Sequence, residues 1–316
     1  MASLNILEVE GLTLATTQAA LVEDVAFTLA PGEMLALVGE SGCGKSVTAL
    51  AVMRLLAPAI RRTAGTIRFD GTDLTTLDDE AMRRLRGRRI GMIFQEPMTS
   101  LNPVFTVGEQ IAEPLRLHLN LSPKQALSRA AELLDLVGLP TPGRQLARYP
   151  HQLSGGQRQR VMIAIALACE PRLLIADEPT TALDVTVQAQ ILALIDRLRR
   201  QLSMACLLIT HDLGVVAEYC DRAAVMYAGR IVETGPAAEV FATPRHRYTA
   251  ALVRTMPARN PPGELLPAIP GQVPPPGSRG QGCPFQPRCD APLPACTDRP
   301  ALAGTPHPAA CWNPAA

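Results

Sequence analysis

Apolar and polar stretches alternate along the chain in a way that predicts strands and helices following one another. Largely apolar runs at residues 34–38, 90–94, 173–176 and 205–210 have the length of buried strands. From Ile191 to Leu202 apolar side chains recur instead at helical spacing. Residues 107–148 also follow a helical pattern, which predicts a helical insertion in an α/β sheet.

The N-terminal part predicts shorter strands and one polar helix. Residues 5–10, 24–29 and 66–69 are expected to form strands of an N-terminal β portion. A helix from about Asp78 carries five arginines, which are Arg83, Arg84, Arg86, Arg88 and Arg89. They fit either a nucleic-acid patch or a solvated helix face. We favour the solvated face because a net charge of +1 leaves no basic excess.

A glycine-rich turn after the first core strand has the spacing of a phosphate-binding loop. The stretch reads Gly39-Glu40-Ser41-Gly42-Cys43-Gly44-Lys45-Ser46 and leads into a segment, from Val47, without Gly or Pro. Glycines let backbone N–H groups face phosphate oxygens without Cβ clashes, and the helix dipole adds positive charge. We expect Lys45 on the terminal phosphates and the Ser46 hydroxyl on magnesium.

Polar side chains stand at the ends of the other core strands. Gln95 follows the second strand, Asp177 and Glu178 end the third, and His211 follows the fourth. Ligands gather at the carboxyl ends of strands in open α/β sheets. We expect Gln95 and Asp177 to bind magnesium and Glu178 to polarise the attacking water. His211 is read as a γ-phosphate contact, although a lone histidine is usually a surface or core residue.

Several of these side chains also have plain structural interpretations. Gln95 fits an ordinary turn residue equally well, since prolines bound the segment from Gln95 to Pro103 and predict a loop. Two solvated carboxylates are the lesser alternative for Asp177 and Glu178, because they end a fully apolar strand.

A second Ser/Gly loop leads directly into another helix. The stretch Leu153-Ser154-Gly155-Gly156-Gln157 precedes an apolar helix expected from Arg160 to Ala168. Such a loop at a helix start is a second anion site. One nucleotide does not need two such loops from one chain, so we expect a dimer. In that dimer the loop of each chain closes over nucleotide bound to its partner.

Composition and charge narrow the class of protein. Hydrophobic residues at 47% and charged residues at 19% describe a globular protein without the charge of a dedicated nucleic-acid binder. The first ten residues lack the pattern of an export signal. The longest apolar run, residues 161–169, is about half the length of a membrane-spanning helix. We therefore expect a cytosolic chain whose membrane role depends on partners.

The eight cysteines fall into two groups. Four are scattered singly and are predicted to be small core residues, namely Cys43, Cys169, Cys206 and Cys220. The other four, Cys283, Cys289, Cys296 and Cys311, lie in the C-terminal tail. The high Pro and Gly content of this tail predicts disorder unless a crosslink holds it together. This cluster indicates a metal more than disulfides, although a disulfide pair stays an alternative. Zinc sites favour C-x-x-C pairs, which this tail lacks, and four thiolates also suit an iron–sulfur cluster.

Taken together, these motifs resemble the ATPase subunit of an ABC transporter. The resemblance covers residues 1 to about 240 and is carried, in chain order, by Gly39 to Ser46, Gln95, Leu153 to Gln157, Ile175-Ala176-Asp177-Glu178, Ala182-Leu183-Asp184 and His211. The segment from Gln95 to Pro103, together with the cysteine tail, narrows the resemblance to ATPases of oligopeptide and dipeptide importers.

The resemblance implies an α/β fold with a P-loop NTPase core, an antiparallel β portion and a helical subdomain at about residues 96–160. An ABC ATPase domain would span residues 1–243. A Pro-rich, Cys-containing extension would span residues 244–316 with the four-cysteine motif. Similar tails in this family carry a 4Fe–4S cluster, which the resemblance implies for Cys283, Cys289, Cys296 and Cys311.

The resemblance also implies ATP and Mg²⁺ as cofactors. The cofactor-binding residues would be Gly39, Ser41, Gly42, Cys43, Gly44, Lys45, Ser46, Val47, Gln95 and Asp177. Magnesium would be held by Ser46, Gln95 and Asp177. Glu178 would be the base for hydrolysis, with His211 as the second catalytic residue. The residues acting in trans on the partner's nucleotide would be Ser154, Gly155, Gly156 and Gln157.

The partners implied are two polytopic permease subunits and a second ABC ATPase, identical or homologous. An extracytoplasmic peptide-binding protein would be reached through the complex, and no nucleic acid is expected. The chain would be a peripheral subunit at the cytoplasmic face of the cell membrane. ATP-driven dimer closure against the permeases would power import of di- or oligopeptides.

Two other functions stay open at this point. Importers of nickel or another small solute share this subgroup's ATPase. From a different class, soluble ABC ATPases act outside transport, but they usually carry two ATPase domains in one chain, a long coiled coil or a strongly basic face. None of these is seen in the sequence.

One departure from the family pattern concerns adenine. Such families usually place an aromatic residue roughly two dozen positions before the Gly-rich loop, where it stacks on the base. Residues 12–18 of this chain contain no aromatic side chain. The sequence therefore assigns no residue to adenine stacking, and a lower nucleotide affinity or base selectivity would follow.

Overall fold

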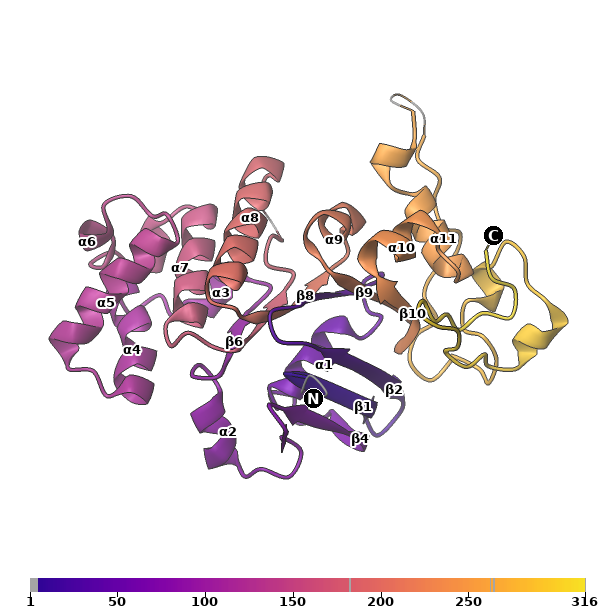
Figure 1. The fold of residues 1–316 in the computed structure, drawn as a ribbon, viewed down its shortest axis with the longest axis horizontal. Coiled ribbons are helices and arrows are strands. Elements are labelled where there is room, and N and C mark those ends of the chain that lie inside the picture. Colours follow the sequence, from indigo (N-terminus) through magenta and orange to yellow (C-terminus); the bar gives the residue numbers. More distant parts are fainter. Residues whose placement is uncertain (1–4, 182, 262, 264, 316) are drawn as a thin grey trace. The chain divides into compact units, whose positions relative to one another are not determined.

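The computed structural model describes residues 5–181, 183–261, 263 and 265–315 (Figure 1). The chain forms two compact units. The first unit comprises residues 1–29, 33–75 and 209–316, and the second comprises residues 30–32 and 76–208. Among the described residues, no helix combines the length and apolarity needed to cross a bilayer.

An antiparallel sheet forms the N-terminal part of the first unit. Its strand order is β2-β1-β4-β5, made of β1 (Leu7–Ala15), β2 (Ala20–Leu29), β4 (Arg61–Phe69) and β5 (Thr72–Asp73). Leu7 on β1 stands opposite Leu29 on β2 and Phe69 on β4. Buried positions largely alternate along β1, so one face of the sheet is apolar. The predicted β portion is present, with longer strands than the apolar runs indicate.

The phosphate-loop strand of the first unit belongs to a second group of strands. This strand, β3 (Met34–Val38), is fully buried and pairs in parallel with β9 (Arg222–Tyr227). Strand β9 in turn forms an antiparallel hairpin with β10 (Arg230–Pro236). The helices of this unit are α1 (Lys45–Val52), α9 (Leu213–Tyr219), α10 (Ala237–Ala242) and α11 (Arg247–Arg254).

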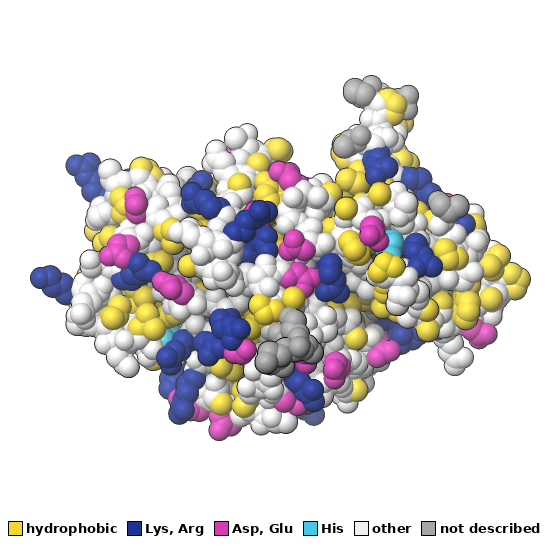
Figure 2. Space-filling model, viewed as in Figure 1, with side chains coloured by type: hydrophobic (Ala, Val, Ile, Leu, Met, Phe, Trp, Pro, Cys, Tyr) yellow, Lys and Arg dark blue, Asp and Glu magenta, His cyan; other side chains and the backbone are white. Residues whose placement is uncertain are grey.

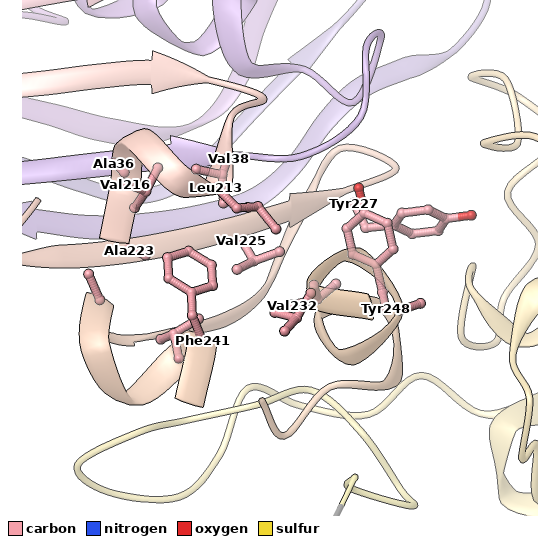
Figure 3. Packing of buried hydrophobic residues seen from close by; sticks show 14 of the residues in the cluster. Ala36, Val38, Leu213, Val216, Ala223, Val225, Tyr227, Val232, Phe241 and Tyr248 are labelled. Atoms are coloured by element: carbon pink, nitrogen blue, oxygen red, sulfur yellow. The ribbon is translucent and has the colours of Figure 1, made fainter. Parts of the chain in front are cut away.

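The core of the first unit includes the C-terminal tail. Figure 3 shows Val225, Val232 and Phe241 packed near Tyr227 and Tyr248, whose ring centroids lie 4.5 Å apart. Phe285 of the tail joins them, with its ring edge-on to Tyr227 at 5.3 Å. Within the tail, which is residues 257–316, the helical structure of the described residues consists of short 3₁₀ turns at Pro257–Arg259, Gln286–Arg288 and Pro294–Thr297. An aromatic side chain in the shared core therefore anchors a segment of little regular structure.

The second unit contains the parallel strands that end in polar residues. In the order β8-β7-β6, these strands are β8 (Ala205–Thr210), whose last two residues are counted with the first unit, β7 (Leu173–Asp177) and β6 (Ile90–Ile93). Ile93 on β6 stands in register with Ala176 on β7. The residues that follow these two strands therefore leave the sheet at the same edge.

Helices make up the rest of the second unit (Figure 1). They are α2 (Asp79–Leu85), α3 (Pro97–Ser100), α4 (Val107–Leu119), α5 (Pro123–Leu136), α6 (Pro142–Gln145), the 3₁₀ turn Pro150–Gln152, α7 (Gly155–Leu167) and α8 (Val185–Gln201). Helices α4 and α5 pack together and against α7, and both begin with capping boxes. The predicted helical insertion is present.

Two predicted boundaries are wrong. The segment from Gln95 to Pro103, expected to be a loop, contains the helical turn α3, which starts with proline at its first position. Helix α7 begins at Gly155 rather than Arg160, because Ser154 and Gln157 cap each other's backbone. Apolar periodicity does not detect either start, since both are set by polar or proline residues.

The arginines of α2 lie on an exposed helix face. Arg83 and Arg84 both pair with Glu80, at 2.9 and 3.4 Å, and their side chains are 64% and 75% exposed. Figure 2 shows Lys and Arg side chains interspersed with Asp and Glu on the visible face. The arrangement is that of a solvated helix with local ion pairs.

Replacing Phe285 tests whether the tail belongs to the core. Phe285→Ala removes a ring that is 2% exposed, so we expect a loss of about 3–5 kcal/mol in the free energy of unfolding. Urea denaturation followed by circular dichroism measures it. Leu265→Ala, at a side chain 99% exposed, is the control and should change stability by less than about 0.5 kcal/mol. Equal stabilities of the two variants would contradict the assignment.

Candidate functional site

The turn between β3 and α1 is fixed by close backbone packing. Gly39 has φ 153° and Gly44 φ 109°, conformations that L side chains rarely adopt. A Cβ on Gly39 would lie 2.1 Å from the backbone oxygen of Met226 on β9. The Gly229 N–H in the β9–β10 turn donates to the Cys43 carbonyl at 2.9 Å. Neighbouring strands therefore hold this turn, named here the phosphate-binding loop (residues 39–46), in one shape.

Lys45 lies inside the phosphate-binding loop. Its side chain is buried, and its ammonium donates to the carbonyls of Gly39 at 2.7 Å and Glu40 at 3.0 Å. Ser46 follows it in the first turn of α1. Burial raises the pKa of the Cys43 thiol, which keeps it neutral at physiological pH. A fixed ammonium at a helix N-terminus, with a neutral thiol beside it, is a site for an anion such as a phosphate chain.

Gln95 and Glu178 meet in the second unit. The Gln95 amide donates to a Glu178 carboxylate oxygen at 3.2 Å, and the Thr181 hydroxyl donates to the same oxygen at 3.1 Å. Asp177, the last residue of β7, is 5% exposed. The parallel register of β6 and β7 brings these residues to one sheet edge. Together they form a carboxylate and amide group of the kind that ligates Mg²⁺ or positions water.

Glu178 has a strained backbone. Its φ is 44°, in the left-handed region that residues other than glycine rarely adopt. Such conformations cost about 1–3 kcal/mol and cluster at functional sites. The left-handed φ lies at the first residue after β7, where the chain leaves the strand.

The second Ser/Gly loop forms the exposed start of α7. The Ser154 hydroxyl accepts from the Gln157 N–H, and the Gln157 side chain accepts from the Ser154 N–H. A Cβ on Gly156 would lie 2.9 Å from Val187, so glycine allows α8 to approach closely. Ser154 and Gly155 are exposed. This geometry leaves a helix N-terminus facing outward, as an anion site contributed to another molecule requires.

Other predicted residues have separate places. His211 is exposed and follows β8 in the first unit, just before the Asp212 N-cap of α9. Asp184 caps α8 by accepting from the Val187 N–H at 2.9 Å. Ala182 lies outside the described residues. Because the phosphate-binding loop and His211 belong to the first unit and Gln95, Asp177 and Glu178 to the second, each group is described by itself.

All four tail cysteines line one small cavity, together with Phe285 and His246; they are Cys283, Cys289, Cys296 and Cys311. The Cys283 N–H donates to the Cys296 carbonyl at 2.9 Å, which joins two of the cysteine-bearing segments. All four are free thiols. In the described part of the chain, no three His, Cys, Asp or Glu side chains are arranged to hold a single metal ion. Four thiols around one cavity are a donor set that suits either a zinc ion or an iron–sulfur cluster.

The scattered cysteines are fully or partly buried. Cys43 and Cys206 are buried, while Cys169 and Cys220 are half-buried. Burial raises the pKa of Cys206 to about 12 and that of Cys169 to about 11. These thiols are neutral at physiological pH, as expected of small core residues.

Comparisons with known proteins place the chain in a family. A family profile described as "ABC transporter" matches residues 22–181, and one described as "Oligopeptide/dipeptide transporter, C-terminal region" matches residues 232–296. This chain is an ABC transporter ATPase subunit. The resemblance found from the sequence motifs is thereby confirmed, and so is the ABC ATPase fold.

Relatives and solved structures agree with this membership. A Brucella abortus protein named "Putative peptide import ATP-binding protein" is 54% identical over 307 residues, covering 92% of this chain and 91% of its own. A second Brucella abortus protein of the same description is 56% identical over 268 residues, covering 85% and 81%.

Solved ATP-binding cassettes share the fold. A dimeric cassette in a post-hydrolysis state with ADP and Pi has a TM-score of 0.66 and 29% identity, covering 73% of this chain and 98% of its own. The cbiO1 protein of Clostridium perfringens, part of an ABC transporter complex, has a TM-score of 0.65 and 29% identity, covering 75% and 91%. The ABC ATPase fold of this chain thus rests on both sequence and structure.

Three residues of this ABC ATPase that lie around Glu40 of the phosphate-binding loop have no motif in the sequence. Tyr248 on α11 and Arg288 in the tail contact Glu40 directly, and Tyr227 on β9 contacts Arg288. The one sequence feature that could have indicated Arg288 is its position between Cys283 and Cys289. Sequence spacing does not show that these residues, far apart along the chain, converge on Glu40.

Gly39→Ala tests the shape of the phosphate-binding loop. The added Cβ would clash with the Met226 carbonyl, so we expect ATP to bind at least about tenfold more weakly. Equilibrium titration with ATP measures the dissociation constant. The matched control is Gly143→Ala in α6, where nothing lies within 4 Å of the added atom and affinity should be unchanged. Equal ATP affinity in both variants would contradict the proposed constraint.

Proposed function

We propose that this ABC ATPase subunit hydrolyses ATP to power a membrane importer of di- or oligopeptides. The phosphate-binding loop carries the proposal, because it holds Lys45 at the start of α1 in a shape that suits a phosphate chain. The Brucella relatives are described as peptide import proteins, and the second matched profile describes oligopeptide and dipeptide transporters. These descriptions favour peptides over nickel as the transported solute.

The proposed roles follow the groups present in each unit. Lys45 would bind the terminal phosphates of ATP, and the loop N–H groups would bind the others. Ser46, Gln95 and Asp177 would hold Mg²⁺, which supplies charge neutralisation on the phosphates when bound. Glu178 would orient and deprotonate the attacking water.

Glu178 is prepared for this role by its neighbours. The Gln95 amide and the Thr181 hydroxyl both donate to one carboxylate oxygen, so that two neighbours fix the position of the carboxylate. His211 would contact the γ-phosphate. Ser154, Gly155, Gly156 and Gln157 would act on nucleotide bound to the partner chain.

The proposed complex follows from this shared site. Two ATPase chains, identical or homologous, would close around two ATP molecules, and one of the similar solved cassettes is dimeric. Closure would act on two permease subunits, so that the chain works at the cytoplasmic face of the membrane. A peptide-binding protein would deliver solute from the other side. We propose the boundary between ATPase domain and extension at residue 243.

We also propose that the tail holds a 4Fe–4S cluster. The support is that all four cysteines line one cavity as free thiols. A bound cluster would supply four crosslinks between tail segments that contain little regular structure. Phe285, which lines the same cavity, would shield the cluster from water on the core side.

Glu178→Gln and Lys45→Ala separate hydrolysis from binding. Glu178→Gln should retain ATP binding and lower turnover by about a hundredfold or more, because the base is lost. Lys45→Ala should weaken ATP binding itself by about tenfold or more. Steady-state ATPase assays and nucleotide titrations measure the two effects.

The matched control for these variants is Glu132→Gln, an exposed carboxylate on α5 paired with Arg129. Its turnover and ATP affinity should equal those of the natural chain. Undiminished hydrolysis by Glu178→Gln would remove Glu178 from the role of base. Unchanged ATP affinity in Lys45→Ala would remove the phosphate-binding loop from the site.

Metal analysis tests the cluster. Protein purified without oxygen should be brown and contain about four irons per chain. Cys296→Ser should lose this iron, whereas Cys206→Ser, in buried strand β8, should keep it. Colourless protein with one zinc per chain, or equal iron in both variants, would overturn the cluster.

A further inference from the structure

A single arginine connects the cysteine tail to the phosphate-binding loop. Arg288 donates through both terminal nitrogens to the Glu40 carboxylate, at 2.7 and 2.9 Å. The Arg288 side chain is 4% exposed and that of Glu40 30%. This paired geometry fixes both distance and direction between the two planar groups.

Arg288 is itself held from three sides within the first unit. Its Nε donates to the Pro270 carbonyl at 2.8 Å, and one terminal nitrogen also donates to the Tyr227 hydroxyl at 3.3 Å. The guanidinium carbon lies 5.7 Å from the Tyr227 ring centroid and 5.9 Å from that of Phe285. The side chain therefore has one available orientation, which is set by β9 and by the tail.

Glu40 connects Arg288 to the rest of the phosphate-binding loop. Its backbone N–H donates to the Tyr248 hydroxyl at 2.8 Å, and its carbonyl accepts from the Lys45 ammonium at 3.0 Å. The same carbonyl accepts from the Cys43 N–H at 3.4 Å. A shift of Glu40 would therefore move the groups that position Lys45.

The charge of Glu40 matters as much as its position. A carboxylate on a loop that binds a polyphosphate repels the ligand unless a cation offsets it. Arg288 supplies that cation without occupying the loop, because it approaches from the tail. Its hydrogen bonds to Glu40 raise the pKa of Arg288 further, so it stays charged at any physiological pH.

We propose that Arg288 is a positioning residue for ATP binding, which orients and neutralises Glu40 and depends on the cysteine tail for its own position. The proposal rests on the proposed nucleotide function of the loop. It makes the tail part of the ATP site of the same chain, through contacts that lie wholly within the first unit.

The dependence on the cysteines follows from the turn that carries Arg288. The Gln286 N–H donates to the Cys283 carbonyl at 3.0 Å, and the Cys289 N–H donates to the Gln286 carbonyl at 3.2 Å. Cys283 and Cys289, at the two ends of this turn, line the cavity shared by the four thiols. A group bound to those thiols would hold both ends of the turn. Its loss would release Arg288 from Glu40.

A double-mutant cycle on the full chain tests the first part. Arg288→Gln should raise the ATP dissociation constant, and the KM for ATP, about tenfold while kcat changes less than about twofold. In a Glu40→Gln background the same substitution should change the dissociation constant less than about twofold, because no carboxylate is left unpaired. A merely structural role for Arg288 would give the same loss in both backgrounds and would overturn the proposal.

The matched control is Arg254→Gln, which breaks another arginine pair in this region. Arg254 contacts Asp290, the residue after Cys289, at 2.9 Å and does not contact Glu40. Its ATP affinity should stay within about twofold of the natural chain. If Arg254→Gln weakens ATP binding as much as Arg288→Gln does, general disturbance of the tail explains the effect and the proposal fails.

Cysteine variants test the second part. Cys289→Ser should weaken ATP binding in the natural background but not in the Glu40→Gln background, and Cys311→Ser, outside the turn, should do the same. Equal affinity in both cysteine variants and the natural chain, or a loss that Glu40→Gln does not suppress, would overturn the dependence on the tail. Lys45→Ala separates the two proposals. If Lys45→Ala weakens ATP binding and Arg288→Gln does not, only the inference about Arg288 fails. If Lys45→Ala binds ATP as tightly as the natural chain, the proposed function fails.

Discussion

The first unit depends on how closely the end of β3 approaches β9. Val38 pairs with Val225, and one residue farther on Gly39 lies so near the Met226 carbonyl that no Cβ would fit between them. This contact decides where the phosphate-binding loop leaves the sheet. The hydrogen bond from Gly229 to Cys43 then closes the loop against the β9–β10 turn. The loop's shape is therefore determined by a strand far away in the sequence as well as by its own glycines.

The group of Gln95, Asp177 and Glu178 in the second unit depends on a different constraint. Parallel register places the ends of β6 and β7 side by side, so Gln95 and Glu178 come into hydrogen-bond contact although they are far apart in sequence. The left-handed backbone of Glu178 completes the arrangement, since it turns the chain after Asp177. The strand register brings Gln95 and Glu178 close together, and the left-handed backbone of Glu178 sets the direction in which the chain leaves β7.

Local signals in the sequence predicted much of this arrangement. The apolar runs located β3, β6, β7 and β8, and the glycine spacing located the phosphate-binding loop, because each signal lies within one short segment. Strand β9 was not assigned, although residues 223–227 form an apolar run as long as that of β3. The start of α7 was placed too late, because it is set by a polar cap that apolar periodicity does not detect. The assigned chemical roles of the site residues stay predictions.

Composition described the tail only in part. Its proline and glycine content predicts disorder in the absence of crosslinks, and the cysteines were the one source of crosslinks visible in the sequence. In the structure, Phe285 enters the aromatic core and Arg288 pairs with Glu40, so the tail is also held by packing and charge. Neither contribution can be read from composition, because each depends on which distant residues surround a single side chain.

The Arg288–Glu40 pair is better explained by geometry than by stability. Burying a guanidinium costs desolvation energy that its attraction to a carboxylate often only offsets, so a buried pair is weak evidence of stabilisation. Here Glu40 keeps 30% of its side chain exposed, which limits the cost on the carboxylate side. What the pair adds is direction, since a bidentate contact allows one relative orientation of two planar groups. For a loop that we propose points backbone N–H groups at phosphate oxygens, a fixed orientation matters more than additional stability.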